Sequence, residues 1–241
     1  MNENHLIRQS LIRCYFTLRS LGCPEEIEPL TGQANVATFE DERDSTLLAP
    51  TELSNEADVE LCAEHLYRRI LELNEHNEFI DEICGVFEEL AMNEVQHSTL
   101  RTNANVAEPL EPDSKNPLAM IERRNALGRR LFSVAITDVG IGIAKAMNAN
   151  LPWMYDDDRA TDLALRTGRS GTGETRGIGL PHVREIACDH DGCLLIASSG
   201  DISKGALGFH GTQAILRAID GVMPNKIQGT FVFATLFTPW G

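Results

Sequence analysis

Hydrophobic residues recur with a helical period in three stretches of the chain. The first stretch covers residues 5–21. The second covers residues 59–73 and follows Ser54 and Asn55, two residue types that commonly cap helices. The third covers residues 78–99. Spacings close to 3.6 residues place such side chains on one side of a helix, so we predict an amphipathic helix in each stretch.

Short apolar runs next to glycine or other turn residues predict strands. The clearest runs are residues 131–137, 193–199 and 229–237. Weaker runs at residues 35–39 and 46–49 indicate two further short strands near the N-terminus.

Two stretches lack any periodicity. Residues 101–117 contain three prolines among Asn, Asp and Ser residues, a composition that predicts an exposed loop. A helical turn is predicted over residues 143–150, and the polar, glycine-rich stretch from there to Gly179 predicts a long mobile connection. A short helix over residues 180–189 and a tight turn at Asp191-Gly192 follow it.

The third predicted helix carries three polar residues on one face. Glu89, Asn93 and His97 stand at successive i, i+4 positions, so their side chains line up. A carboxylate can act as a general base, an amide oxygen can bind Mg²⁺, and an imidazole can orient its neighbours. The alternative is an ordinary solvated face.

A second candidate motif follows the strand predicted at residues 131–137. It reads Asp138-Val-Gly140-Ile-Gly142-Ile143. Two glycines allow the backbone to approach a flat ligand closely, and the carboxylate can accept a hydrogen bond from an exocyclic amine. A tight strand-to-helix turn is the alternative.

A third candidate motif is the glycine-rich segment 169–180, which opens a predicted helix. Exposed N–H groups and the helix dipole at such a place favour a phosphate, and Arg176 adds positive charge. The segment has neither Walker nor dinucleotide-binding spacing, and a flexible linker is the alternative. Cys188, His190 and Cys193 could be zinc ligands, but they supply only three, and a helix-to-strand turn explains the same segment.

Composition and charge argue against several classes of protein function. The 241 residues are 42% hydrophobic, and no run approaches the roughly 20 apolar residues that span a bilayer. The net charge of −15 argues against a nucleic-acid-binding surface. The excess lies in residues 1–117, which hold 24 acidic and 8 basic residues, whereas residues 118–241 hold 12 and 13. With no secretory leader and six scattered cysteines, we expect a cytoplasmic protein without disulfides.

The order of the three motifs, together with the final strand that begins at Gly229-Thr230, resembles the GHKL superfamily. That family includes histidine-kinase ATPase domains, gyrase and MutL ATPase domains, a heat-shock chaperone and anti-sigma serine kinases. The resemblance covers roughly residues 55–239. Histidine kinases commonly have a lysine where this chain has Gln96, followed here by His97, as in the anti-sigma serine kinases.

The resemblance implies a fold as well. It is the Bergerat ATP-binding fold of the α/β (α+β) class, a two-layer sandwich of helices on a mixed, largely antiparallel sheet. The ATPase domain would span residues 55–241, after an N-terminal extension of uncertain fold at residues 1–54. Residues 144–176 would form a lid over the nucleotide.

The resemblance also implies roles for individual residues. Glu89 would be the catalytic base, Asn93 the Mg²⁺ ligand, and Asp138 the acceptor for the adenine amino group. The other residues expected to contact ATP are His97, Gly140, Gly142, Ile143, Arg176, Gly177, Gly179, Leu180 and Thr230.

We therefore expect a Mg-ATP-binding protein that hydrolyses ATP slowly or transfers its γ-phosphate to switch a protein partner. The resemblance suggests a sigma factor or a STAS-like switch protein as that partner, and neither a nucleic acid nor a membrane. An anti-sigma-type serine kinase, a nucleotide-gated interaction module with little catalysis and a scaffold with a decayed site remain alternatives. Homodimerisation is left open.

Overall fold

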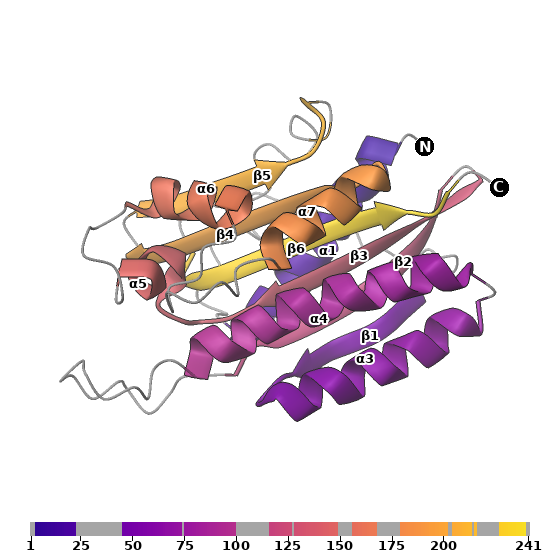
Figure 1. The fold of residues 1–241 in the computed structure, drawn as a ribbon, viewed down its shortest axis with the longest axis horizontal. Helices are drawn as coiled ribbons and strands as arrows, with labels where there is room; N and C mark the ends of the chain where they lie inside the picture. The colour runs from indigo at the N-terminus through magenta and orange to yellow at the C-terminus, as the bar shows by residue number, and fades with distance from the viewer. Residues whose placement is uncertain are drawn as a thin grey trace.

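A computed structural model describes residues 3–22, 45–73, 75–99, 116–126, 128–148, 156–167, 179–201, 204–213, 215 and 227–239. Its helices are α1 (Glu3–Gly22), α3 (Glu56–Leu71), α4 (Asn77–Thr99), α5 (Gly142–Asn148), α6 (Asp157–Thr167) and α7 (Gly179–Asp189). Its strands are β1 (Ser45–Glu52), β2 (Leu118–Ala126), β3 (Arg129–Thr137), β4 (Cys193–Asp201), β5 (Lys204–His210) and β6 (Gly229–Phe237) (Figure 1). The chain is thus an α+β protein.

The strands form one six-stranded sheet in the order β1-β2-β3-β6-β4-β5. Every ladder between the described strands is antiparallel, so the mixed sheet that we expected is not seen there. The C-terminal strand β6 lies in the middle of the sheet, between β3 and β4. This order brings the end of β3 next to the start of β6, although some 90 residues separate them in the sequence.

Both faces of the sheet are covered by helices. The pleat sends alternate side chains to opposite faces, and a central strand such as β3 is apolar on both. Phe132, Val134 and Ile136 pack with α3, α4 and α7, whereas Leu131 and Ala135 pack with α1 on the other face. Figure 1 shows α1 behind the sheet and α3, α4 and α7 in front of it. The expected two-layer sandwich was therefore incomplete, because α1 adds a third layer.

The N-terminal elements share the core of the rest of the chain. Helix α1 buries Leu6, Ile7, Leu11 and Leu18 against the sheet. Strand β1 is hydrogen-bonded to β2 and forms the edge of that sheet. The predicted boundary between residues 54 and 55 thus falls between two elements that pack on a common core.

The predicted helices at residues 5–21, 59–73, 78–99 and 180–189 are confirmed to within a few residues by α1, α3, α4 and α7. Asn55 caps α3, since its side chain accepts a hydrogen bond from the backbone N–H of Asp58 at 3.2 Å. The predicted strand at 35–39 and most of the loop at 101–117 lie outside the described residues. Strands β2 and β5 were not predicted.

The long mobile connection predicted before Gly179 was wrong in part, because it contains α6. The buried face of this helix consists of Ala160, Thr161, Ala164 and Leu165, so it holds only one large apolar side chain. Its first turn is capped by Asp156, whose carboxylate accepts the N–H of Arg159 at 2.9 Å. A helix with so few large apolar residues is easily mistaken for a polar loop.

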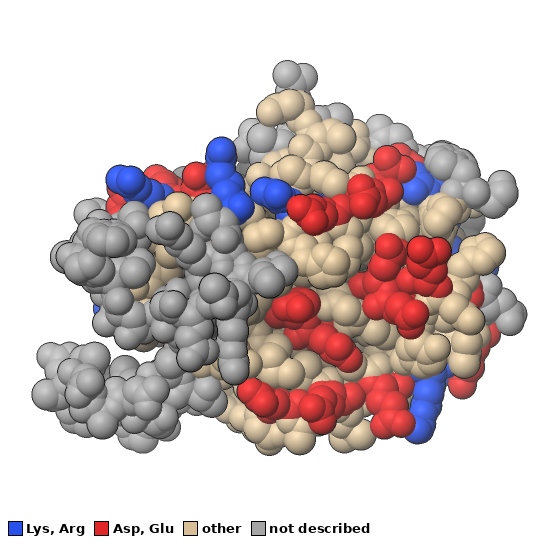
Figure 2. Space-filling view, viewed as in Figure 1, with Lys and Arg blue, Asp and Glu red and all other residues tan. Residues whose placement is uncertain are grey.

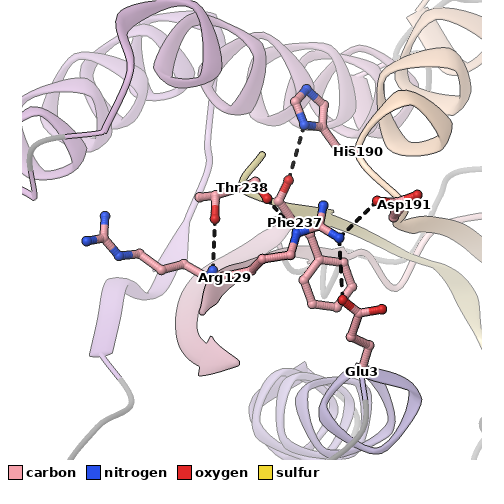
Figure 3. Close-up of polar contacts among 7 residues, drawn as sticks. Glu3, Arg129, His190, Asp191, Phe237 and Thr238 are labelled. Carbon is pink, nitrogen blue, oxygen red and sulfur yellow. Dashed lines mark hydrogen bonds and ion pairs between the residues drawn. The ribbon is translucent and has the colours of Figure 1, made fainter. Parts of the chain in front are cut away.

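Arg129, at the start of β3, ties the chain ends together. It is only 6% exposed and donates to the backbone oxygen of Thr238 at 2.6 Å and to the carboxylates of Asp191 (2.9 Å) and Glu3 (3.4 Å). Figure 3 shows the guanidinium between these groups, over the ring of Phe237, at 4.9 Å from the ring centroid. One side chain thus connects α1, the α7–β4 turn and the end of β6.

Among the described residues, no helix is long and apolar enough to cross a membrane.

Candidate functional site

Helix α4 presents the first pair of predicted site residues. Its apolar stripe, which includes Ile83, Phe87 and Leu90, is buried against the sheet. Glu89 is exposed and Asn93 is half-buried beside that stripe. The backbone of His97 is helical as predicted, but its side chain is outside the described part of the structure.

Gly179, the first residue of α7, lies directly against this pair. A Cβ atom placed on Gly179 would come within 3.2 Å of Nδ2 of Asn93 and closer still to Oε2 of Glu89. Both distances are shorter than ordinary contacts, so only glycine fits here without a shift of those side chains. The predicted phosphate-binding glycine therefore lies against the predicted catalytic base and the predicted Mg²⁺ ligand.

Asp138 follows β3 and is held by the start of β6. Its Oδ1 accepts the N–H of Thr230 at 2.7 Å and the N–H of Gly140 at 3.0 Å. Its own backbone N–H donates to the oxygen of Thr230 at 2.9 Å. The side chain is 5% exposed, so both its position and its orientation are fixed.

Two further contacts join this loop to β4. The hydroxyl groups of Ser198 and Thr230 lie 3.4 Å apart, and the Ser198 oxygen accepts the N–H of Ile143 at 2.8 Å. Ile143 is the second residue of α5, and Gly142 before it has φ +74°. Thr230 thus touches Asp138 through its backbone and Ser198 through its side chain. Ser198 was not among the predicted site residues. It could have been noticed in the sequence as the polar residue that follows the apolar run 193–197.

Glycine is required at position 229 as well. Gly229 has φ +77°, and a Cβ atom there would lie 2.5 Å from the backbone oxygen of Asp138 and 2.5 Å from the nitrogen of Gly140. These backbone atoms cannot move aside without opening the loop. The close approach of β6 to this loop therefore depends on the absence of a side chain.

Glu94, next to Asn93, was missed as a site residue. It is 7% exposed, and its carboxyl group is hydrogen-bonded to Asp138. Burial and the charge of Asp138 raise the pKa of Glu94 well above its ordinary value. Its position between Ala91 and Val95 on the buried stripe of α4 was the available signal, because a carboxyl there must find a partner.

Arg19 supports the same loop from the other face of the sheet. Its side chain is fully buried and donates to Oγ1 of Thr137 at 2.9 Å and to the backbone oxygens of Asp138 and Gln228, each at 3.0 Å. A buried cation of α1 thus holds both segments that carry Asp138 and Thr230. Arg19 was not predicted as a site residue. The only indication in the sequence was that a charged residue stands within the apolar stripe of the helix.

The side chains of this site are suited to hold Mg²⁺ through oxygen atoms. Glu89 offers a carboxylate and Asn93 a carboxamide oxygen, and Mg²⁺ is usually held by one or two protein ligands together with phosphates and water. Within the described residues, no three His, Cys, Asp or Glu side chains gather as a metal site. A divalent cation here would take its remaining ligands from water or from a bound phosphate.

Some of the predicted residues cannot be placed. Arg176 and Gly177 lie outside the described residues, as does most of the glycine-rich segment. Leu180 is described and packs at the edge of the core between the sheet and α4.

The zinc alternative is not supported. Cys188 contacts Nε2 of His210 at 2.6 Å, His190 contacts Glu82 at 2.6 Å, and Cys193 lies 3.4 Å from Oγ1 of Thr235. The three potential ligands thus point to three different partners.

Comparisons with protein-family models, with curated proteins and with solved structures found no match for this chain. The functional assignment therefore rests on the geometry of the site.

Proposed function

We propose that this chain binds Mg-ATP as a GHKL-type protein with the Bergerat fold. The observation that carries the proposal is the convergence of motifs that are far apart in the sequence. Gly179 packs on Glu89 and Asn93, while Glu94 of the same helix is hydrogen-bonded to Asp138, which Thr230 holds in place. A random set of polar residues and glycines has no reason to meet in this way.

The side chain of Asp138 can accept a hydrogen bond from the amino group of a purine base. An ionised carboxylate has about four acceptor positions. Two are used by the N–H groups of Thr230 and Gly140, and one by the carboxyl of Glu94. About one position remains, which suits a single N–H of the adenine amino group.

The start of α7 supports phosphate binding. The first N–H groups of a helix have no partners within the helix, and the helix dipole is positive at that end. Gly179 adds no side chain, so the backbone at this end lies close to Glu89 and Asn93. Phosphates bound there would lie beside the Asn93 carboxamide, which would hold the magnesium ion. When bound, Mg²⁺ neutralises phosphate charge and so lowers the barrier to attack at phosphorus.

Glu89 is the best-placed base. It is exposed, so its carboxyl group is accessible and can take the proton of a water molecule or a hydroxyl group. With water as the nucleophile, the chain is an ATPase. With a serine or threonine hydroxyl of a regulatory protein, such as a sigma factor or a STAS-like protein, it is a protein kinase.

A second function, nucleotide-gated binding of a partner with little catalysis, is favoured by the charge of α4. This helix holds six acidic residues and no lysine or arginine. Negative charge beside the phosphates opposes the build-up of charge in phosphoryl transfer, which makes turnover slow.

Titration calorimetry with Mg-ATP tests the binding proposal. We expect Asp138→Asn to weaken affinity at least tenfold, which corresponds to about 1.4 kcal/mol, because the amide group loses one acceptor oxygen. Asp189→Asn, on the exposed end of α7, is the matched control and should bind as the wild type does. If the wild type does not bind Mg-ATP, or if both variants bind equally well, the proposal is wrong.

Release or transfer of labelled γ-phosphate separates the two functions. An enzyme should lose turnover in Glu89→Ala while that variant still binds ATP. If the wild type binds ATP but neither protein releases or transfers phosphate, the nucleotide-gated binding module is the correct function.

A further inference from the structure

Helix α3 carries most of the large apolar side chains that are exposed in the described structure. They are Leu61 (67% exposed), Leu71 (47%) and Tyr67 (36%), and the remaining one, Leu21, is on α1. At 3.6 residues per turn, the three residues of α3 fall within about 120° of one another around the helix axis. They therefore form a stripe about 15 Å long, ten residues at 1.5 Å each. We call this stripe and Glu60 and Glu64 within it the outer face of α3.

The opposite side of α3 accounts for its place in the fold. Val59, Ala63, Leu66 and Ile70 are buried against the sheet and α4. The apolar residues of the outer face are thus not needed to attach the helix. Exposed apolar side chains that gather in this way often mark an interaction site.

The surroundings of the outer face are strongly acidic. Exposed carboxylates of α3 and α4 include Glu56, Glu60, Glu64, Glu78, Asp81, Glu88 and Glu89. Figure 2 shows acidic side chains over the two helices, with few basic ones among them. These carboxylates lie close enough together to affect one another. The pKa of Glu88 is raised, first by burial and then by the charges of Glu89 and Glu60.

The basic residues of α3 neutralise only part of this surface. Arg68 is paired with Glu64, and Arg69 lies 3.5 Å from the carboxylate of Glu72. Both pairs are exposed and lie in the last turns of the helix. The first half of α3 and the whole of α4 are therefore left with negative charge.

We propose that the outer face of α3 docks a basic amphipathic helix of a partner protein. Apolar residues of that helix would pack between Leu61, Tyr67 and Leu71, as ridges of one helix fit grooves of another. Lysine and arginine residues beside them would meet Glu60 and the acidic residues of α4. This inference goes beyond the nucleotide site and does not need it to be occupied.

The negative charge around the outer face of α3 argues against other binding partners. Nucleic acids and anionic lipid surfaces are repelled by carboxylates. A second copy of the chain would bring the same acidic face against itself. Residues 23–44, which precede β1, contain seven acidic residues and one arginine, so this segment does not complement the face either.

A synthetic 18-residue helix of leucine and lysine, labelled with a fluorophore, provides the probe. Its binding to the nucleotide-free full chain is measured by fluorescence anisotropy. We expect Leu61→Ser/Leu71→Ser to weaken binding at least tenfold, and Glu60→Lys at least threefold. The matched controls are Leu21→Ser on α1 and Asp189→Lys on α7, and both should bind within twofold of the wild type.

Three results would overturn the proposal. One is equal binding by all variants, which indicates unspecific charge attraction. Another is equal binding of a leucine–glutamate peptide of the same pattern. The third is self-association in sedimentation that Leu61→Ser/Leu71→Ser abolishes, which makes a second copy the occupant. Because no nucleotide is present, failure here is independent of the Mg-ATP result.

Discussion

The carboxyl group of Glu94 on α4 is hydrogen-bonded to the carboxylate of Asp138 after β3. This contact joins the helix that carries Glu89 and Asn93 to the loop that carries Asp138. Two buried carboxyl groups can stay in contact only when they share a proton, since two like charges at this distance repel strongly. The pair therefore connects the geometry of the site to protonation.

The first prediction concerns the pH dependence of stability. The pKa of Glu94 is raised in the folded protein, so the unfolded chain loses this proton first, from about its ordinary value of 4.5 upward. The free energy of unfolding should therefore fall as pH rises from 5 to 8, by at most about 1.4 kcal/mol per pH unit from this group. Glu94→Gln keeps a donor for Asp138 but cannot ionise.

Urea unfolding at pH 5, 6, 7 and 8 measures the effect. The wild type should lose stability relative to Glu94→Gln as the pH increases. Parallel pH profiles for the two proteins would show that Glu94 ionises normally in the folded state.

The second prediction concerns Gly179. An added methyl group would displace the ends of the Glu89 and Asn93 side chains and would meet no backbone atom among its nearest contacts. Gly179→Ala should therefore change the free energy of unfolding by less than about 1 kcal/mol but weaken Mg-ATP binding at least tenfold.

Gly85→Ala is the control for this helix region, since a Cβ there meets nothing within 4 Å. It should stabilise α4 by about 0.5–1 kcal/mol and leave ATP binding unchanged. Calorimetric titration and urea unfolding measure both quantities. A stable Gly179→Ala protein with wild-type affinity contradicts the proposed role.

The third prediction concerns Gly229. Alanine at this position would combine a positive φ with backbone contacts at 2.5 Å. We expect Gly229→Ala to cost roughly 3 kcal/mol, from the left-handed conformation and from overpacking. Gly128→Ala has φ +87° but open space, so it should cost only about 1 kcal/mol. Equal losses in urea unfolding would mean that the contact with the Asp138 loop is unimportant.

The fourth prediction concerns Arg129. Replacing it with methionine keeps much of the aliphatic volume but removes the bonds to Thr238, Asp191 and Glu3. The loss should be about 2–3 kcal/mol, because hydrogen bonds to charged groups at a buried side chain are among the stronger ones. Thermal unfolding measures it.

Arg166→Met serves as the control. The pair of Arg166 with Asp162 is at an exposed i, i+4 position, so its removal should cost less than about 0.5 kcal/mol. If both arginine variants lose the same stability, the network in Figure 3 does not hold the chain ends.

Part of the fold could be predicted because the pattern of the sequence was strong. Helices α3 and α4 have wide stripes of large apolar residues, and β3 and β6 are compact apolar runs. Strand β2 could not be predicted in this way, because Glu122 and Arg124 are buried in it as an ion pair at 3.0 Å. A strand that buries charged residues does not show the alternation of apolar and polar residues by which strands are predicted.

The candidate site was predictable where its residues are local. Glu89 and Asn93 share a helix face by spacing alone, and Asp138 closes an apolar run. Glu94 and Arg19 were missed, since their importance comes from partners on other elements. Spacing along one helix says nothing about such partners.

The sequence by itself determined which segments are amphipathic, where glycines punctuate them, and that the acidic excess lies in the first 117 residues. Each of these properties depends only on residues that are close to one another in the sequence. Only the tertiary structure decided that β6 lies between β3 and β4, so that Thr230 holds Asp138 and Gly179 meets Glu89. The reason is physical: burial of both faces of one sheet selects the strand order, and that selection depends on the whole chain at once.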